Sequence, residues 1–307
     1  MHYIQEESIM KKALALILTA SLLAGVLTAC GSSEAQTDAA ETTTEEAAAE
    51  ETADTDAQAE TGDLQVITVA ATAVPHAEIL EAAKPILAEQ GYDLQITVFD
   101  DYVQPNEVVE AGDIDCNYFQ HIPYLNSYNE ERGTHLVSVG EIHYEPIGIY
   151  AGTESDLSNI PDGADIAIPN DTTNEARALL ILQDNGIITL KEGAGIDATI
   201  NDIAENPHNI NFVEMEAAQV SKVLSEVAFA VINGNYALDA GLNAQTDALA
   251  SETSDSLAAQ TYVNVVVVKE GNEDNEGVKA LVDVLKSDDI KKFIEETYEG
   301  AVVPFEG

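Results

Sequence analysis

Arg177 carries the most informative chemistry in the sequence. The chain contains two arginines, Arg132 and Arg177. A capping box, with the Thr172 hydroxyl three residues before Glu175, predicts that a helix begins here and that Arg177 lies in its first turns. A cation near a helix N-terminus interacts unfavourably with the helix dipole. The position of Arg177 would be explained if its guanidinium faces an anion that the helix N-terminus also attracts. We expect Arg177 to hold a ligand carboxylate; the alternative is an ion pair with Glu175 or Asp171.

Two further segments combine polar and aromatic side chains where strands are expected to end. The run 115–124 reads Asp-Cys-Asn-Tyr-Phe-Gln-His-Ile-Pro-Tyr, and the run 231–236 reads Val-Ile-Asn-Gly-Asn-Tyr. The first could surround an apolar ligand side chain, although core packing and capping would explain it equally well. In the second, Asn233 could bind the carboxylate and the ammonium of a zwitterion, and a simple Asn-Gly turn is the alternative.

Strands and helices must place these segments together. Apolar strands are expected at 66–71, 94–99, 116–119, 166–168, 211–215, 229–232 and 262–269, with helices between them. This alternation predicts an α/β fold with parallel sheets. Two such units, joined by strand-like segments at 144–150 and 262–269, predict two lobes with a double crossover and a binding cleft between them.

The composition excludes several partners. The chain has 56 acidic and 12 basic residues, and its formal net charge is −44. Such a surface repels nucleic acid, whose binding needs clustered lysine and arginine, and it repels anionic lipid head groups. With two cysteines, Cys30 and Cys116, no disulfide framework is expected, and Cys116 is expected to be a small buried residue.

The first 63 residues predict export and anchoring. Met10-Lys11-Lys12 and the apolar run 13–29 are typical of a secretory signal, and translation starting at Met10 would remove an acidic stretch that a signal does not need. The sequence 27–30, Leu-Thr-Ala-Cys, resembles the bacterial lipobox, so we expect a signal peptide over 1–29 and a diacylglyceryl group on Cys30; an ordinary cleaved signal is the alternative. The acidic segment after Cys30 predicts a disordered tether over 30–63. We expect one lobe to comprise 64–145 plus 268–307 and the other 146–267.

The motifs together are similar to the methionine-binding lipoprotein family, of the NlpA or MetQ type. The run 115–124 is the most specific signature. Further matches are Val74-Pro75-His76-Ala77-Glu78-Ile79-Leu80, 101–106, 168–171 with Asn174 and Arg177, and the turn at Asn233. The resemblance spans essentially all of 65–307. It implies a two-lobed, periplasmic-binding-protein-like (type II) fold that delivers methionine to an ABC importer with permease and ATPase subunits, and it leaves the choice between L- and D-methionine open.

The resemblance also implies roles for single residues. Tyr102, Phe119 and His121 would surround the ligand side chain. Arg177 would hold the carboxylate, and Asn174 and Asn233 would hydrogen-bond the zwitterion. No cofactor, metal site or catalytic residue is implied.

Other functions remain open from the residues alone. A methionine-containing dipeptide or another small apolar amino acid could use the same groups. The five histidines after residue 63 stand at no metal-ligand spacing, so a metal-ion receptor is a lesser alternative. The chain lacks Gly-x-Ser-x-Gly, His-Glu-x-x-His and a phosphate-binding glycine loop, so we do not expect an enzyme.

Overall fold

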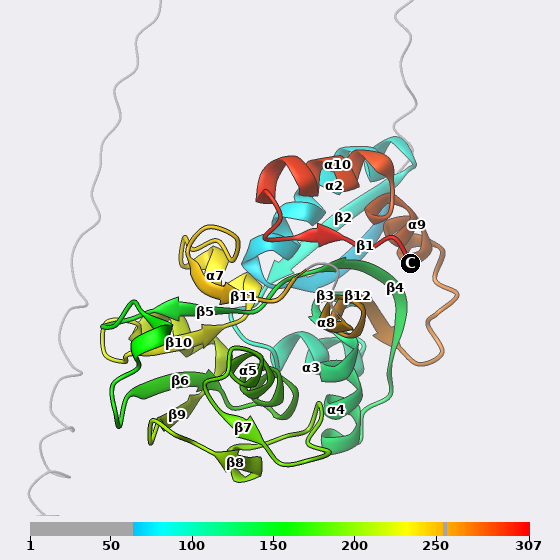
Figure 1. The fold of residues 1–307 in the computed structure, drawn as a ribbon. Helices are drawn as coiled ribbons and strands as arrows, with labels where there is room; N and C mark the ends of the chain where they lie inside the picture. Colours follow the sequence, from blue (N-terminus) through cyan, green and yellow to red (C-terminus); the bar gives the residue numbers. More distant parts are fainter. Residues whose placement is uncertain (1–63, 254–256) are drawn as a thin grey trace, which may run out of the picture. The chain divides into compact units, whose positions relative to one another are not determined.

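The computed structural model describes residues 64–253 and 257–307. The expected signal peptide, Cys30 and the tether lie outside the described residues. Within them, the chain forms two main β-sheets with helices packed against both faces of each (Figure 1). We call the part built around the six-stranded sheet the first lobe and the part built around the five-stranded sheet the second lobe. None of the described helices combines the length and the apolar character needed to cross a bilayer.

The sheet of the first lobe is mixed. Its strand order is β13 (Val303–Pro304), β4 (Leu136–Tyr144), β12 (Val263–Lys269), β3 (Cys116–His121), β1 (Gln65–Ala71) and β2 (Tyr92–Val98). Strand β1 runs parallel to β2 and β3, whereas β12 runs antiparallel to β3 and β4. The valine-rich β12 is buried along six of its seven residues, as expected for a strand covered on both faces.

Helices cover both faces of this sheet. Helices α2 (Glu78–Glu89), α9 (Glu276–Leu285) and α10 (Asp288–Tyr298) pack on one face, and α3 (Gln104–Ala111) and α4 (Ile122–Arg132) pack on the other. A short π-helical turn, η1 (Ala73–Ala77), leads into α2. Helix α4 follows β3 directly, so the side chains at the end of that strand lie beside the start of a helix.

The sheet of the second lobe has the order β11 (Ala248–Ser251), β5 (Gly148–Ala151), β10 (Phe229–Ile232), β6 (Asp165–Pro169) and β9 (Asn211–Met215). Helix α5 (Thr172–Asp184) packs on one face, and α6 (Ala217–Val220) and α7 (Gly234–Asp239) lie on the other. Strands β7 (Thr189–Leu190) and β8 (Ile203–Glu205) form a separate hairpin. Strand β6 runs parallel to β9 and β10. Because α5 follows β6 and α7 follows β10, both helices begin at the carboxyl ends of these strands, on the same side of the sheet.

The chain passes between the two sheets twice. Residues 145–147 connect β4 to β5, and residues 252–262, which include α8 (Leu257–Thr261), connect β11 to β12. The expected crossover strand at 144–150 is therefore two strands, β4 and β5, separated by a short connection. The expected lobe limit at residue 267 falls inside β12, which pairs with β4 from Val263 to Lys269 and with β3 from Asn264 to Val268. The remaining lobe limits stay a prediction.

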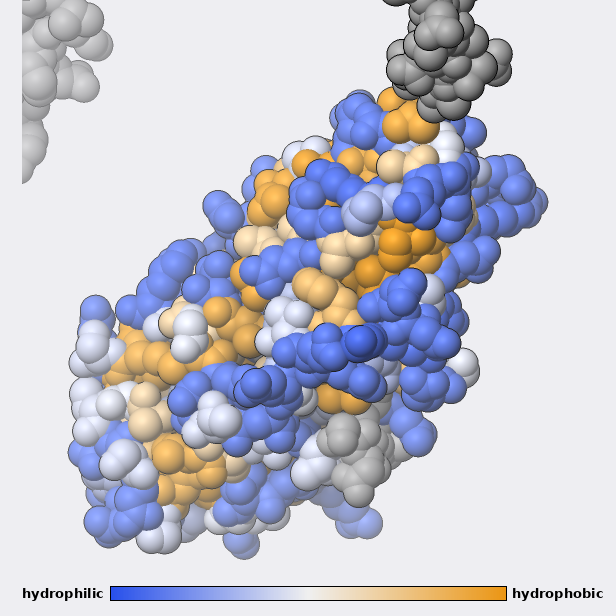
Figure 2. Space-filling view, turned by 90° about the horizontal axis from the view of Figure 1, so that it is seen from above, coloured by the Kyte–Doolittle hydropathy of each residue, from blue (hydrophilic) through white to orange (hydrophobic). Residues whose placement is uncertain are grey.

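The surface agrees with the acidic composition. Figure 2 shows hydrophilic residues over much of one face, with hydrophobic residues in patches between them. The large apolar side chains that are most exposed belong to different elements, among them Val66 on β1 and Val98 on β2. Scattered exposed apolar residues of this kind are ordinary in a folded domain.

Candidate ligand-binding site

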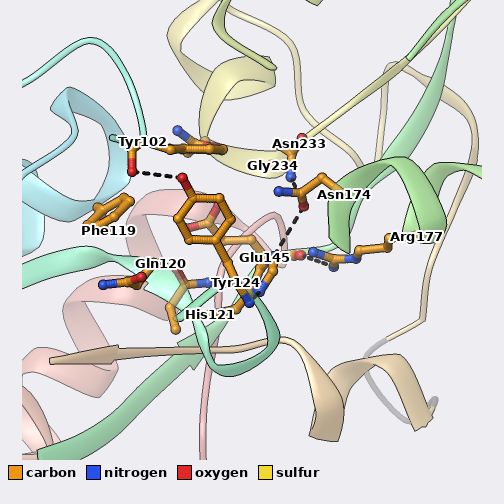
Figure 3. A pocket seen from close by; sticks show the side chains of 12 residues that line it. Tyr102, Phe119, Gln120, His121, Tyr124, Glu145, Asn174, Arg177, Asn233 and Gly234 are labelled. Carbon is orange, nitrogen blue, oxygen red and sulfur yellow. Dashed lines mark hydrogen bonds between the residues drawn. The ribbon is translucent and has the colours of Figure 1, made fainter. Parts of the chain in front are cut away.

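A small cavity lies between the two sheets; the centre of a water-sized sphere can occupy about 20 Å³ of it, and the space between its atoms, including space open to solvent, is about 330 Å³. Its wall comes from both lobes and from the first crossover (Figure 3). The lining residues are Tyr102, Phe119, Gln120, His121, Tyr124, Glu145, Asn174, Arg177, Asn233, Gly234, Asn235 and Asn264. All six residues predicted from the sequence are among them, so the structure brings the whole predicted set together. Their roles toward a ligand stay a prediction.

Aromatic rings of the first lobe form one end of the cavity. The ring centroid of Tyr102 lies 5.9 Å from that of Phe119 and 5.6 Å from that of Tyr124, and the Phe119 and Tyr124 centroids are 6.1 Å apart. The Tyr124 hydroxyl donates to the backbone oxygen of Tyr102 at 2.9 Å, which ties α4 to the segment before α3 (Figure 3). These contacts hold three rings around one apolar space.

Arg177 lies at the other end of the cavity and is 3% exposed. Its Nε donates to Glu252 Oε1 at 2.9 Å, and its Nη2 donates to the Glu145 backbone oxygen at 2.8 Å and to Glu252 Oε2. Glu145 and Glu252 stand on the two crossovers, so one side chain of α5 ties both connections together. The Nη1 group makes no hydrogen bond within residues 64–253 and 257–307.

The local contacts of Arg177 differ from the sequence-based expectation. Asp171, and not Thr172, is the N-cap of α5, because its side chain accepts a hydrogen bond from the Asn174 backbone N–H at 3.1 Å. Glu175 accepts from the backbone N–H of Ile200 at 2.9 Å instead of closing a capping box. The predicted capping box is therefore wrong. The alternative, an ion pair of Arg177 with Glu175 or Asp171, is not formed either, because Arg177 pairs with Glu252.

A chain of amide and imidazole groups crosses the cavity wall. Asn174 Oδ1 accepts from Asn233 Nδ2 at 2.7 Å and lies 3.1 Å from His121 Nε2 (Figure 3). His121 Nδ1 in turn accepts from the backbone N–H of Tyr124 at 3.1 Å, so Nε2 carries the ring proton and donates it to Asn174. Burial lowers the pKa of His121 to about 3, and the ring is neutral at physiological pH.

Asn233 keeps one polar atom free. It is the N-cap residue of α7, but its side chain makes no capping hydrogen bond. The side-chain amide therefore does not stabilise the Asn-Gly turn. Asn233 Oδ1 is buried and has no hydrogen-bond partner among the described residues. An unpaired buried acceptor is unfavourable by about 1–3 kcal/mol, and a ligand donor would satisfy it.

The contacts between the lobes are direct. The Tyr102 hydroxyl donates to Asn235 Oδ1 at 2.5 Å, the Tyr236 hydroxyl donates to the Asp100 backbone oxygen at 3.0 Å, and His121 meets Asn174 as described above. The cavity is consequently enclosed by hydrogen bonds between the two halves, which suits a site that surrounds a small molecule.

Comparison with known proteins decides the family. The family model described as NlpA lipoprotein matches residues 67–306. The chain belongs to the NlpA lipoprotein family. The methionine-binding lipoprotein MetQ of Bacillus subtilis is 39% identical over 295 residues, which are 94% of this chain and 98% of that one.

Two solved structures show the same fold. A lipoprotein of Ruminococcus gnavus superposes with a TM-score of 0.78 at 66% identity and covers 79% of this chain and 100% of its own. A nutrient-binding protein of Burkholderia cenocepacia, solved bound to methionine, gives a TM-score of 0.74 at 42% identity and covers 78% of this chain and 99% of its own. The two-lobed fold expected from the sequence is thus confirmed.

This NlpA lipoprotein uses cavity residues that the sequence did not single out. Glu145 and Asn264 stand on a crossover and on β12, in segments interpreted only as strands. Glu145 is 5% exposed; burial raises its pKa, and the charges of His76 and Arg177 act in the opposite sense. Gly234 is needed beside it, because a Cβ at that position would lie 2.7 Å from Glu145 Cβ. The glycine of the Asn233-Gly234 pair could have indicated this close approach of Glu145, but from the sequence the pair suggested only a turn.

Proposed function

We propose that this NlpA lipoprotein is an extracytoplasmic receptor that binds methionine in the cavity between its lobes and delivers it to an ABC importer. The names of its relatives support the proposal: MetQ of Bacillus subtilis is called a methionine-binding lipoprotein, and the Burkholderia structure holds methionine. A Coxiella burnetii relative with 38% identity is described as an ABC transporter substrate-binding protein.

The observation that carries the proposal is the arrangement of charge and apolar surface in one cavity. Arg177 and Glu145 lie at the polar end, and Tyr102, Phe119 and Tyr124 form the apolar end. A free amino acid with an unbranched apolar side chain has the same division, with a carboxylate and an ammonium at one end.

Each part of methionine would then meet a suitable partner. The free Nη1 donors of Arg177 would bind the carboxylate, while Glu145 and Asn233 Oδ1 would accept from the ammonium. The thioether would pack on the aromatic rings, where each sulfur–ring contact contributes ~0.3–1.5 kcal/mol. Hydrogen bonds to the charged groups of the ligand contribute ~1.5–3 kcal/mol each.

Membrane attachment through a lipid on Cys30, with the segment 31–63 as a tether, is part of the same proposal. Such an anchor would keep the receptor beside the permease and ATPase subunits of its importer.

Isothermal titration calorimetry on protein freed of bound ligand by unfolding and refolding tests the proposal. We expect L-methionine to bind to the wild type and the Arg177→Ala variant to lose about tenfold or more in affinity. Arg132→Ala is the matched control, since Arg132 is exposed and its closest carboxylate contact, to Glu107, is 3.6 Å long. Wild-type protein that binds no methionine, or equal affinities in the two variants, would contradict the proposal.

A further inference from the structure

The Arg177 guanidinium lies over the ring of a tyrosine that stands outside the cavity. Tyr262 joins α8 to β12 at the end of the second crossover and is 3% exposed. The Arg177 Cζ atom lies 4.2 Å from the centroid of the Tyr262 ring, well inside the range of about 6 Å in which an aromatic face attracts a cation. The described residues that line the cavity do not include Tyr262, so its effect on a ligand must be indirect.

Hydrogen bonds and the ring restrict the guanidinium in different directions. Nε and Nη2 of Arg177 donate to Glu252 and to the Glu145 backbone oxygen, and such bonds fix the group within its own plane. They leave it able to tilt out of that plane, whereas an aromatic ring against which it packs opposes the tilt. Tyr144 is a second ring nearby, but its centroid is 5.7 Å from Arg177 Cζ. Tyr262 is therefore the closer of these two rings.

Tyr262 also contacts a cavity residue of the first lobe. Its ring centroid lies 5.1 Å from that of His121, with the two planes at 76°, which is an edge-to-face contact of the kind that stabilises aromatic pairs. Arg177 comes from the second lobe, and both His121 and Arg177 line the cavity (Figure 3). One ring on a connection between the lobes thus contacts one ligand-facing group from each of them.

The ring, and not the hydroxyl, makes these contacts. The Tyr262 hydroxyl is buried and has no hydrogen-bond partner in the part of the chain that the structure describes. The Tyr144 hydroxyl, in contrast, donates to Glu252 Oε2 at 2.6 Å. A buried hydroxyl without a partner is unfavourable, so a role that requires Tyr262 must lie in its aromatic face.

The ring also separates the guanidinium from a second pocket. Arg177 and Tyr262 line this pocket beside Leu180 and Ile181 of α5, and among the described residues Arg177 is the one that lines both it and the cavity. A smaller side chain at position 262 would leave room for water beside the guanidinium. Water weakens the attraction between a cation and a carboxylate.

We propose that Tyr262 is a positioning residue whose ring holds the Arg177 guanidinium and the His121 imidazole from outside the cavity, so that the free protein already presents the carboxylate-binding group in its bound orientation. The inference rests on the proposed function and adds a residue of the second crossover to the groups that select the ligand carboxylate. Preorganisation of this kind raises affinity because less conformational freedom is lost on binding.

The first test compares L-methionine with L-methioninamide, which keeps the ammonium and the thioether but lacks the carboxylate charge. Calorimetry gives the affinity for L-methionine, and competition against L-methionine gives that for the amide. Tyr262→Leu should lower the preference for L-methionine over the amide by about tenfold, whereas Tyr262→Phe should keep it within about twofold of the wild type. An unchanged preference in Tyr262→Leu, with both ligands weakened equally or not at all, would overturn the inference.

Tyr128→Leu is the matched control. Arg132 Cζ lies 5.2 Å from the Tyr128 ring centroid, and neither of these two residues lines the cavity. The preference in Tyr128→Leu should therefore equal that of the wild type. A fall as large as in Tyr262→Leu would mean that loss of any buried ring has this effect, which would overturn the inference. Wild-type protein that does not bind L-methionine would overturn the proposed function instead.

The second test separates the π face from the bulk of the ring, and it remains informative if Tyr262→Leu does not fold. Fluorine withdraws electron density from an aromatic face and so weakens its attraction for a cation, while the ring keeps nearly the same size. The preference for L-methionine over the amide should fall from Tyr262→Phe to Tyr262→3,5-difluorophenylalanine and again to Tyr262→pentafluorophenylalanine. Equal preferences along this series would show that the ring only fills space and would overturn the inference.

Discussion

The Arg177–Glu252 pair allows a quantitative prediction. The two groups are joined by hydrogen bonds from Nε and Nη2, and both side chains are nearly buried. Glu252 Oε2 also accepts from the Tyr144 hydroxyl at 2.6 Å and from the Ile147 backbone N–H at 3.1 Å. Glutamine at position 252 has one acceptor oxygen, so it must leave some of these donors unpaired and present an amide N–H to another N–H.

Breaking a buried pair from one side costs about 3–5 kcal/mol, since the remaining charge stays buried. Either Glu252→Gln or Arg177→Met should therefore lower the free energy of unfolding by that amount. For a folded body of this size the loss corresponds to a fall in Tm of about 6–20 °C. The double variant should lose less than the sum of the two, with a coupling of about 1–3 kcal/mol.

Urea denaturation followed by circular dichroism measures these values. Glu81→Gln is the control, because its pair with Lys84 is exposed and pairs of that kind contribute about 0.2–1 kcal/mol. Single variants that lose less than about 1 kcal/mol, or losses that simply add, would refute the reasoning. A second readout follows from the proposed function: the rise in Tm on adding methionine should be larger in Glu252→Gln, where the ligand carboxylate compensates Arg177.

Three further predictions concern the cavity and its histidines. Phe119→Ala should weaken binding of methionine far more than that of alanine, and equal losses in calorimetry would argue against an aromatic contact with the thioether. Gly234→Ala should cost about 1–3 kcal/mol of stability and weaken ligand binding, because the added Cβ meets the crossover side chain; a variant as stable as wild type would exclude that contact. The depressed pKa values of His76, His121 and His143 mean that the unfolded chain binds more protons below about pH 6.5. Stability should therefore fall between pH 6.5 and 5, by about 2 kcal/mol per histidine. The decline should be shallower in the His143→Gln variant. Equal free energies of unfolding from urea titrations at pH 6.5 and pH 5 would contradict the prediction.

The sequence predicts the main elements because their signals are local. The β-branched run that became β12 (Val263–Lys269) lies within one residue of its expected limits of 262–269. Strands β7, β8, β11 and β13 have two to four residues each and were not expected. Strands this short carry too little alternation to be recognised, and their place is decided by neighbours that are distant in sequence.

The candidate site shows the same difference between local signals and contacts that are distant in sequence. The lining residues that belong to compact motifs, such as His121 and Asn233, could be predicted from those motifs. The partner of Arg177 could not, since Glu252 is 75 residues away and nearer carboxylates are engaged elsewhere: Asp171 caps α5 and Glu175 binds the Ile200 N–H. The approach of His76 Nε2 and His143 Nε2 to Glu145 Oε1, at 3.3 and 2.7 Å, could likewise not be predicted, because no ligand-like spacing connects the two histidines along the chain.

The position of β12 has a consequence for the order in which the protein folds. This strand lies between β3 and β4, yet it is made only after the entire second sheet. Until residue 269 is available, β3 and β4 have no partner between them, and the gap equals two strand spacings of roughly 4.8 Å each. The second lobe is one continuous stretch of chain and can complete its own sheet first. We therefore expect a nascent chain that stops near residue 251 to hold a formed second half and an open first half, and the last strands to close the molecule.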